Sequence, residues 1–319
     1  MFEQEILEEL NMKIADAVHD NWVDSFAPKW MNPYLKLSRF DRPIGTWLLL
    51  IPCWWGLLLG IIDDQNLKLH DVWIFFGCAI GATLMRGSGC TWNDIADRKF
   101  DGMVERTRNR PIPLGQVTVR KAIFWIVFQT ILASFVLFSF NKLTIFLGFI
   151  SLLPVAIYPF AKRFTWWPQF FLGIAFNWGA LLAFAAHTGT LNIAAICLYL
   201  SGIAWTLFYD TIYALQDIED DALIGIKSTA RLFGKDSKRW LFVFVLLGCL
   251  WMGISLFLVT EGISLFLCLL GVLGFAFHSF WQISKIVPED GTILLRLFRS
   301  NRNAGLIPVL FFLLAVFIG

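Results

Sequence analysis

Two runs of acidic side chains contain the residues best suited to chemistry, and each run follows a long apolar segment. The first run is NDIADRKFD, residues 93–101, and the second is DTIYALQDIEDD, residues 210–221. In the first run Asp94, Asp97 and Asp101 recur at i, i+3 and i+7, which places them within about 60° of one another on a helix of 3.6 residues per turn. The spacing therefore predicts a stripe of carboxylates along one helix face.

The second run repeats this arrangement. Asp210, Asp217 and Asp221 recur at i, i+7 and i+11, within about 40° of one another, and Tyr213 shares their face. Carboxylates this close repel one another unless a cation neutralises them. A hard divalent cation with oxygen ligands, usually Mg²⁺, removes the repulsion and keeps coordination positions open for phosphate oxygens. We therefore predict two carboxylate clusters that bind Mg²⁺.

A plainer interpretation stays open, in which both runs are solvated helix ends that pair with nearby basic side chains. The basic residues near the first run are Arg98, Lys99, Arg106, Arg108 and Arg110. Charged groups at membrane depth are costly and usually functional, but groups at the membrane boundary escape much of this cost by reaching water. Glu219 and Asp220 lie off the second stripe, so solvation explains these two residues at least as well as metal binding.

Basic residues near the acidic runs are candidates for binding a diphosphate that a metal has bridged to the aspartates. They are Arg98, Arg106, Arg110, Lys162 and Arg163. Lys162 and Arg163 follow the fourth apolar segment, where the general excess of basic residues on the cytoplasmic side of membrane proteins explains them equally well.

The composition indicates an integral membrane protein. Of the 319 residues, 57% are hydrophobic and only 16% are charged, whereas soluble domains average about 25% charged residues. Nine apolar stretches are long enough to cross a bilayer as helices. They are residues 44–62, 72–92, 120–140, 143–160, 168–186, 191–213, 239–259, 262–283 and 303–319. The expected fold is all-α, a polytopic bundle of nine transmembrane helices.

Loop charges predict the orientation of these helices, because Lys and Arg gather on the cytoplasmic side. Of the 26 Lys and Arg residues, 23 fall in the N-terminal tail and in every second loop after it. The N-terminus and both acidic runs are therefore expected on the cytoplasmic side and the C-terminus on the opposite side. Residues 1–31 lack the features of a signal or transit peptide, so we expect an acidic amphipathic tail followed by a transmembrane domain at 32–319.

Isolated polar residues within the apolar segments receive separate interpretations. Arg86 lies inside the second span and should face a partner or a cavity, because a guanidinium in lipid is costly. His70, His187 and His278 have no carboxylate at ligand spacing in the sequence. We expect these histidines to serve in packing or at interfaces rather than in metal binding.

Four stretches carry a resemblance to a known family. They are SRFDRPIGTWLLLIPCWWG (38–56), MRGSGCTWNDIADRKFDGMVERTRNRPIPLG (85–115), YPFAKRFTWWPQ (158–169) and YDTIYALQDIEDDALIGIKSTARLFG (209–234). The chain resembles the UbiA family of intramembrane prenyltransferases, and within it the branch that prenylates 4-hydroxybenzoate. The resemblance covers most of the apolar region in the expected order.

The resemblance implies a nine-helix bundle around a central cavity that opens to lipid and is capped by the two acidic runs and their loops. It assigns the binding of Mg²⁺, and through it of a polyprenyl diphosphate, to Asn93, Asp94, Asp97, Asp101, Asp210, Asp217 and Asp221. Among these, Asp94, Asp97, Asp217 and Asp221 are the expected catalytic residues. Arg39 is the family's candidate for binding the aromatic carboxylate, with Arg42 as a competing choice and Tyr213 as a further contact.

The implied reaction is Mg²⁺-dependent transfer of a polyprenyl group to the ring of 4-hydroxybenzoate, as in ubiquinone biosynthesis. The expected partners are the two substrates and membrane lipid, without nucleic acid or an obligate protein partner, and the expected location is a bacterial inner membrane with a periplasmic C-terminus. A haem, chlorin, naphthoate or homogentisate acceptor remains an alternative. A cation-coupled transporter is the alternative from another class, because such carriers also hold acids and Arg within a helix bundle.

Overall fold

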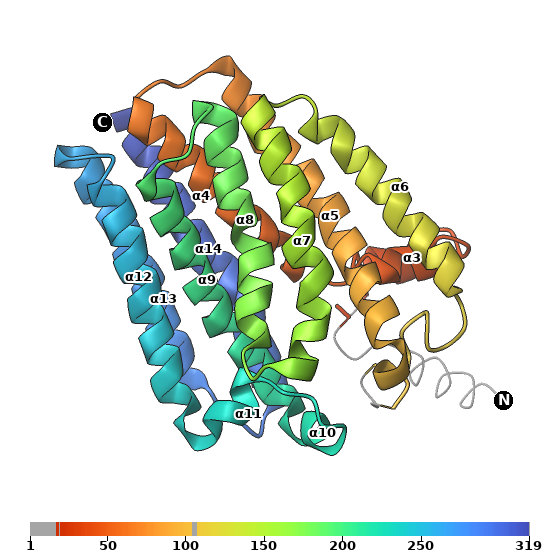
Figure 1. Cartoon of the computed structure of the whole chain (residues 1–319). Coiled ribbons are helices and arrows are strands. Elements are labelled where there is room, and N and C mark those ends of the chain that lie inside the picture. Colours follow the sequence, from red (N-terminus) through yellow and green to blue (C-terminus); the bar gives the residue numbers. More distant parts are fainter. Residues whose placement is uncertain (1–16, 19, 104–106, 319) are drawn as a thin grey trace. The chain divides into compact units, whose positions relative to one another are not determined.

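The structure is a computed structural model that describes residues 17, 18, 20–103 and 107–318. Within these ranges the chain forms helices and no strand (Figure 1), and nine of the helical stretches found there are long and apolar enough to cross a membrane. The long helices are α4 (Ile44–Asp64), α5 (Leu69–Asp101), α6 (Val119–Leu137), α7 (Lys142–Phe164), α8 (Pro168–Thr188), α9 (Ile193–Ala214), α12 (Ser237–Phe257), α13 (Gly262–Lys285) and α14 (Gly291–Ile318). The expected all-α fold with nine membrane helices is confirmed.

Short elements connect or precede the long helices. They are α2 (Trp22–Ser25), α3 (Asn32–Leu37), the 3₁₀ turn η1 (Leu215–Asp217), α10 (Ile218–Leu223), α11 (Thr229–Phe233) and the 3₁₀ turn η2 (Gly234–Asp236). Most of the predicted acidic tail, residues 1–16 and 19, lies outside the described residues, so its amphipathic structure stays a prediction.

Two helix boundaries differ from the prediction for a physical reason. The helix α5 continues to Asp101 instead of ending at residue 92, and α14 begins at Gly291 instead of residue 303. Hydropathy detects only the apolar part of a helix. The helix itself continues wherever its polar side chains find hydrogen-bond or ion-pair partners. In α14 the buried Asn301 accepts a hydrogen bond from Trp205 Nε1 at 3.1 Å and donates one to Gln282 Oε1 at 3.1 Å.

The chain divides into two compact units. Unit 1 comprises the described residues up to Gly45 together with Thr83–Ala133, and unit 2 comprises Thr46–Ala82 together with the described residues from Ser134 onward. Each unit contains one of the two acidic runs. The two units are therefore described separately.

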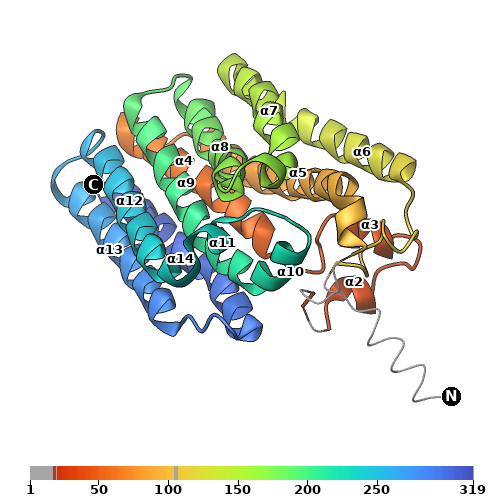
Figure 2. The ribbon, with the colours of Figure 1, turned by 60° about the horizontal axis from the view of Figure 1, so that its bottom comes forward.

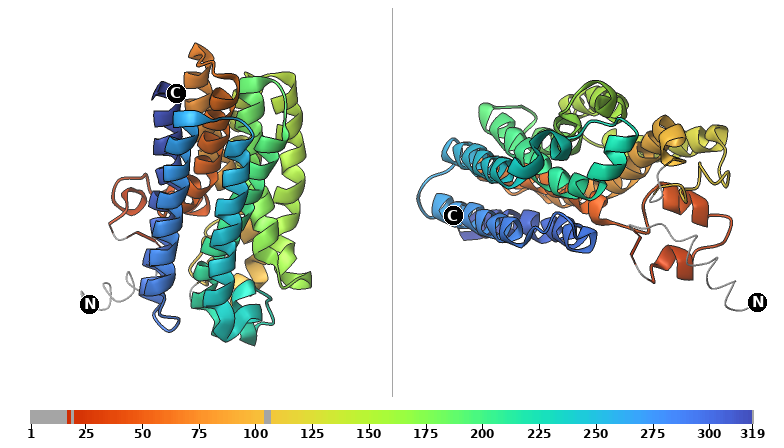
Figure 3. Two further views of the ribbon diagram at one scale, coloured as in Figure 1. Left: turned by 90° about the vertical axis from the view of Figure 1, so that its left-hand side faces the viewer. Right: turned by 90° about the horizontal axis from the view of Figure 1, so that it is seen from below.

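Unit 2 is built around α9, which packs against α8, α12 and α14. The helix α7 packs on α8, and α13 lies between α12 and α14, so that α13 and α14 run side by side (Figure 3). The buried rings of Trp55 on α4, Trp205 on α9 and Phe275 on α13 contact one another, with centroids 5.0 to 6.2 Å apart. Fully burying large apolar side chains of this kind stabilises a core by about 1.5–3 kcal/mol each, although within a bilayer packing rather than exclusion of water supplies this gain.

Close backbone approach holds α4 against α8. A side chain at Gly56 would place its first carbon 2.0 Å from the backbone oxygen of Ala180. Only glycine fits at such a contact, and small residues of this type let membrane helices pack closely.

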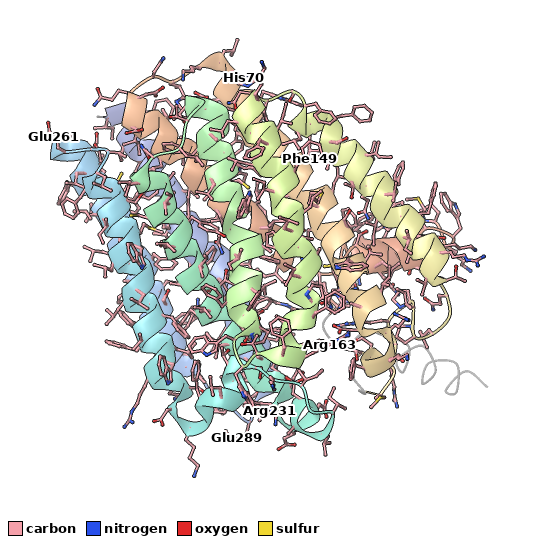
Figure 4. The ribbon with its side chains drawn as sticks, viewed as in Figure 1. His70, Phe149, Arg163, Arg231, Glu261 and Glu289 are labelled. Carbon is pink, nitrogen blue, oxygen red and sulfur yellow. The ribbon has the colours of Figure 1, made fainter. Side chains whose placement is uncertain are left out.

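The two ends of unit 2 carry different loops. Arg163, Arg231 and Glu289 lie toward one end, and His70 and Glu261 lie toward the other (Figure 4). At the end that carries His70, the side chain of His187 is buried between two carboxylates, with Nδ1 2.6 Å from Asp71 Oδ1 and Nε2 2.9 Å from Asp64 Oδ1. His187 therefore contacts two carboxylates that are distant from it in the sequence, in addition to the packing or interface role that the sequence predicted.

Candidate functional site

The first acidic run lies on the last turns of α5, in unit 1. The helix continues without a break to Asp101, so the predicted carboxylate stripe is present as a helical feature. Asp94 is 0% exposed, Asp97 is 1% exposed and Asp101 is 6% exposed, whereas Asn93 is half-buried. These three carboxylates are therefore not a solvated helix end.

Two arginines hold Asp94. Arg39 Nη1 lies 2.9 Å from Asp94 Oδ2 and Arg39 Nη2 lies 2.5 Å from Asp94 Oδ1, which makes a bidentate ion pair. Arg110 Nη1 lies 3.3 Å from the same Oδ1. Planar, bidentate pairs of this type combine strength with a fixed orientation of the carboxylate.

Arg110 also holds Asp101 and so bridges two acids of the run. Its Nη1 lies 3.0 Å from Asp101 Oδ1 and 2.9 Å from Asp101 Oδ2. Thr107 supports the same turn, because its hydroxyl donates to the Asp101 carbonyl at 2.9 Å. The alternative that the run pairs with nearby basic residues is therefore partly observed, although the pairing takes place in a buried setting.

The backbone of the segment before α4 directs Arg39 toward Asp94. Arg39 has φ of 62°, in the left-handed region that non-glycine residues rarely adopt. Ser38 fixes this turn to α6, because its hydroxyl donates to Gln129 Oε1 at 3.0 Å and accepts from Trp125 Nε1 at 2.8 Å. Gly87 on α5 admits the Gln129 side chain, since a first side-chain carbon at Gly87 would lie 2.0 Å from Gln129 Oε1.

A small apolar cluster completes unit 1 around this turn. Its buried members are Leu37, Ile95, Val117 and Ala122. Leu37 lies two residues before Arg39 and Ile95 directly follows Asp94, so packing in this cluster brings the two ends of the ion pair together. The same cluster includes Val117 from the segment that follows Arg110.

A second ion pair lies beside the first one. Asp41 is 0% exposed, and its Oδ1 lies 3.3 Å from Arg42 Nε. Burial raises the pKa of the Asp41 carboxyl, although Arg42 and Arg39 partly oppose this effect. Burial by itself would lower the pKa of the Arg39 guanidinium, but the charge and hydrogen bonds of Asp94, together with other nearby groups such as Asp41, raise it overall.

Arg86 lies against the start of α4, also within unit 1. A side chain at Gly45 would place its first carbon 2.4 Å from Arg86 Nε and from Arg86 Nη2. The guanidinium therefore lies directly on the backbone of Gly45. This contact agrees with the expectation that Arg86 faces a partner.

The second acidic run, in unit 2, does not follow one helix. The helix α9 ends at Ala214, the 3₁₀ turn η1 spans Leu215–Asp217, and α10 begins at Ile218. The predicted common face for Asp210, Asp217 and Asp221 assumed 3.6 residues per turn throughout, whereas the 3₁₀ turn has a different rotation per residue. The common face therefore stays a prediction. The side chains of all three aspartates and of Tyr213 are half-buried.

The segment after α10 is tied to α7, α8 and α9. Lys227 N donates to the Lys162 carbonyl at 3.1 Å, and Thr229 N donates to Gln169 Oε1 at 3.1 Å. The hydroxyls of Thr211 and Thr229 lie 2.6 Å apart. Figure 2 brings this end forward and shows α10 and α11 side by side. These contacts bring the second run close to the end of α7 that carries Lys162.

The predicted diphosphate-binding residues occupy different surroundings. Arg110 is engaged with two aspartates, and Arg98 is exposed and donates to the Ile95 carbonyl at 2.8 Å. Lys162 is half-buried, and Arg163 is exposed with its guanidinium 4.9 Å from the centroid of the Phe160 ring. Arg106 lies outside the described residues.

The carboxylates of the first run are suited to binding a cation. In the described part of the chain no group of three or more His, Cys, Asp or Glu residues has metal-binding geometry. Arg110 nevertheless places one positive charge against both Asp94 and Asp101. Carboxylate oxygens that share a cation in this way are also the ligands that Mg²⁺ prefers.

Comparison with known proteins identifies the family. A model of the UbiA prenyltransferase family matches residues 49–302. The chain belongs to this family. The solved structure of a UbiA homologue from Archaeoglobus fulgidus bound to GPP and Mg²⁺ is similar to the chain, with a TM-score of 0.66 at 19% identity over 89% of this chain and 99% of that one. An apo UbiA homologue from Aeropyrum pernix K1 has a TM-score of 0.65 at 19% identity over 83% of this chain and 97% of that one. At this identity the two structures show that the UbiA fold is shared.

Curated UbiA relatives are more similar in sequence. The mitochondrial 4-hydroxybenzoate polyprenyltransferase of Dictyostelium discoideum is 43% identical over 302 residues, which is 94% of this chain and 63% of that protein. The corresponding protein of Bos taurus is 45% identical over 287 residues, which is 88% of this chain and 74% of that protein. The chain thus spans less than two thirds of the first relative's length and about three quarters of the second's.

Proposed function

We propose that this UbiA family member transfers a polyprenyl group from a polyprenyl diphosphate to the aromatic ring of 4-hydroxybenzoate. Its similarity to curated 4-hydroxybenzoate polyprenyltransferases over most of the chain supports the two substrates. The buried carboxylates at the end of α5 carry the proposal on the structural side, because an apolar chain has little other reason to hold three buried acids together.

Seven oxygen ligands are proposed to hold Mg²⁺. In unit 1 they are Asn93, Asp94, Asp97 and Asp101, and in unit 2 they are Asp210, Asp217 and Asp221. When bound, the metal neutralises charge on the diphosphate and stabilises it as a leaving group. A related UbiA homologue was solved with GPP and Mg²⁺, and this supports the cofactor.

The chain's own cations are proposed to assist the same step. Arg110 already lies between Asp94 and Asp101, from where its guanidinium can contact a diphosphate bound to those acids. Lys162 lies close to the second run through the Lys227 contact. Arg98, Arg106 and Arg163 complete the proposed diphosphate-binding set.

Ionisation of an allylic diphosphate leaves a cation that water would quench, so the reaction needs a dry site. The 32 Phe and 15 Trp residues of the chain supply rings that exclude water and stabilise a cation through their faces. The carbon ortho to the phenol hydroxyl then attacks the cation, and an aspartate or the released diphosphate accepts the ring proton. The resemblance to the UbiA family favours Arg39, Arg42 and Tyr213 as candidates to contact the aromatic acid.

The protein is a multi-pass integral membrane protein. We propose that it resides in the inner membrane of a bacterial cell, with its N-terminus and both acidic runs cytoplasmic and its C-terminus periplasmic. The distribution of Lys and Arg along the sequence supports this orientation.

The test is a product assay with purified protein in detergent or nanodiscs. We expect 4-hydroxybenzoate, a donor pool of mixed chain lengths and Mg²⁺ to yield ring-prenylated products that mass spectrometry identifies, and we expect chelation of the metal to abolish them. A product formed only with a naphthoate, homogentisate, chlorin or haem acceptor would replace the proposed acceptor. Absence of both prenylated product and Mg²⁺-dependent diphosphate release would overturn the proposal and favour a transporter.

A further inference from the structure

Both terminal nitrogens of the Arg39 guanidinium are engaged within unit 1. They face the two oxygens of Asp94, and Nη1 also donates to the Lys36 carbonyl at 3.0 Å. Bidentate binding of a carboxylate uses two N–H groups of the planar guanidinium. To bind an aromatic acid through its two terminal nitrogens, Arg39 would have to release Asp94.

Release of Asp94 would be costly. Asp94 is 0% exposed and Arg39 is 7% exposed, so separating them removes the bidentate partner of a buried carboxylate. A buried charge that loses its partner costs far more than a surface charge does. The geometry therefore favours a lasting pair over one that opens in each catalytic cycle.

The surrounding backbone also holds Arg39 in place. Its φ of 62° lies in a region that persists only where neighbouring contacts impose it. Those contacts are the Ser38 hydrogen bonds to Gln129 and Trp125 on one side and the apolar packing of Leu37 on the other. These contacts favour a fixed position for Arg39 over one that changes when a substrate binds.

The ion pair orients more than one acid. Arg39 Nη2 and Arg110 Nη1 share Asp94 Oδ1, so the orientation of Asp94 affects its contact with Arg110. Arg110 in turn pairs with both oxygens of Asp101. A continuous set of charge contacts thus runs from Arg39 through Asp94 and Arg110 to Asp101.

We infer that Arg39 is a positioning residue for the diphosphate site, which acts by orienting Asp94, and that it does not contact the carboxylate of the aromatic acceptor. This inference rests on the proposed function, because it specifies the role of one residue in the proposed reaction.

The first experiment measures donor binding with no acceptor present. Geranyl diphosphate and Mg²⁺ are titrated into detergent-purified wild type, Arg39→Gln, Asp94→Asn and the double variant, with binding followed by calorimetry. We expect each single variant to weaken binding about tenfold and the double variant to bind within about twofold of Asp94→Asn, because coupled residues are not additive. Wild-type affinity in Arg39→Gln, or a double-variant loss equal to the product of the single losses, would overturn the inference.

The second experiment separates kcat from KM. In Arg39→Lys, which keeps the charge and loses the planar fork, we expect kcat to fall while KM for 4-hydroxybenzoate stays within about twofold of wild type. A KM raised about tenfold or more with kcat retained would return Arg39 to the acceptor site. Arg239→Gln is the matched control, since Arg239 pairs with Asp236 on the exposed surface, and it should behave as wild type in both experiments.

These outcomes are distinguishable from failure of the proposed function. If wild type forms no prenylated product and binds no geranyl diphosphate, the proposed function fails before any variant is compared. A monodisperse elution profile and a thermal unfolding transition in detergent identify a variant that has lost its fold. Arg39→Lys then provides the test if Arg39→Gln does not fold.

Discussion

At the scale of single residues, neighbouring carboxylates of one acidic run have different surroundings. Asp94 is completely buried and contacts both Arg39 and Arg110, whereas Asp101 is slightly exposed and pairs with Arg110. Removing a carboxylate that is buried between two cations leaves those cations without a partner and lowers the stability of the fold. Substitutions in this run should therefore affect stability as well as activity.

The first prediction concerns Asp94→Asn. We expect prenyl transfer to fall by about 10² or more because a charged ligand of the diphosphate site is lost, and we expect the free energy of unfolding to fall by about 3 kcal/mol because Arg39 and Arg110 lose their counter-ion. Product formation and chemical denaturation in detergent measure the two effects. Asp236→Asn, at the exposed pair with Arg239, is the control and should stay within about 0.5 kcal/mol of wild type. Wild-type stability in Asp94→Asn would contradict the described pairing.

The second prediction concerns the pH dependence that Asp41 causes. Burial raises the pKa of this carboxyl in the folded state, so the folded state binds the proton more tightly than the unfolded state does. Its stabilising contribution is complete below the unfolded value of about 3.9 and is lost as pH rises through the raised folded value. The stability of wild type relative to Asp41→Asn should therefore decrease with rising pH.

Thermal unfolding of both proteins in detergent, from about pH 4 to about pH 8, measures this difference. A difference that stays constant, or that grows with rising pH, would show that the pKa of Asp41 is not raised in the folded protein.

At the scale of secondary structure, glycines decide how closely two helices approach. Gly56 on α4 lies against the backbone of Ala180 on α8, whereas Gly81 on α5 has open space where a side chain would begin. Both glycines lie inside long helices. Replacing each glycine by alanine therefore separates the effect of helix packing on stability from the effect of helix propensity.

The third prediction compares Gly56→Ala with Gly81→Ala. We expect Gly56→Ala to lower the free energy of unfolding by about 1–3 kcal/mol, because the added carbon forces α4 away from α8. Gly81→Ala should be neutral or stabilising by up to about 1 kcal/mol, because alanine favours a helix over glycine. Unfolding in detergent measures both values. Equal effects at the two positions would show that α4 and α8 do not approach as closely as described.

At the scale of the whole molecule, the described residues contain nine helices that can cross a membrane. Successive loops therefore lie on alternate sides of the membrane. Within unit 2, Glu261 and Glu289 lie in the loops before and after α13 and toward opposite ends of it (Figure 4). The charge distribution predicts that the loop of Glu289 is cytoplasmic and that the loop of Glu261 is on the other side. The orientation can therefore be tested with one cysteine in each loop.

The fourth prediction is the labelling pattern of Glu261→Cys and Glu289→Cys in intact bacterial cells. A membrane-impermeant maleimide should label the cysteine at position 261 and should label the one at position 289 only after the cells are opened. The six native cysteines are buried or half-buried, so wild type provides the background. The reverse pattern would invert the proposed topology.

Much of the architecture followed from the sequence because it depends on local patterns. Apolar stretches about as long as a bilayer is thick must form helices, since the backbone has no other partner in lipid. The acidic run at 93–101 was expected to be helical, and α5 contains it. The turns also agree with their residues, since Asn141 caps α7 and Gly189 ends α8 in the left-handed region.

Partners that are distant in the sequence could not be predicted in this way. The sequence by itself determined a helical membrane protein with two acidic runs, because composition and spacing are local properties, and it carried the resemblance to the UbiA family. Only the tertiary structure decided that Arg39, 55 residues before Asp94, pairs with it, that η1 interrupts the second run, and that His187 lies between Asp64 and Asp71. Ion pairs and close contacts depend on how the helices pack, and packing brings together residues that no local pattern relates.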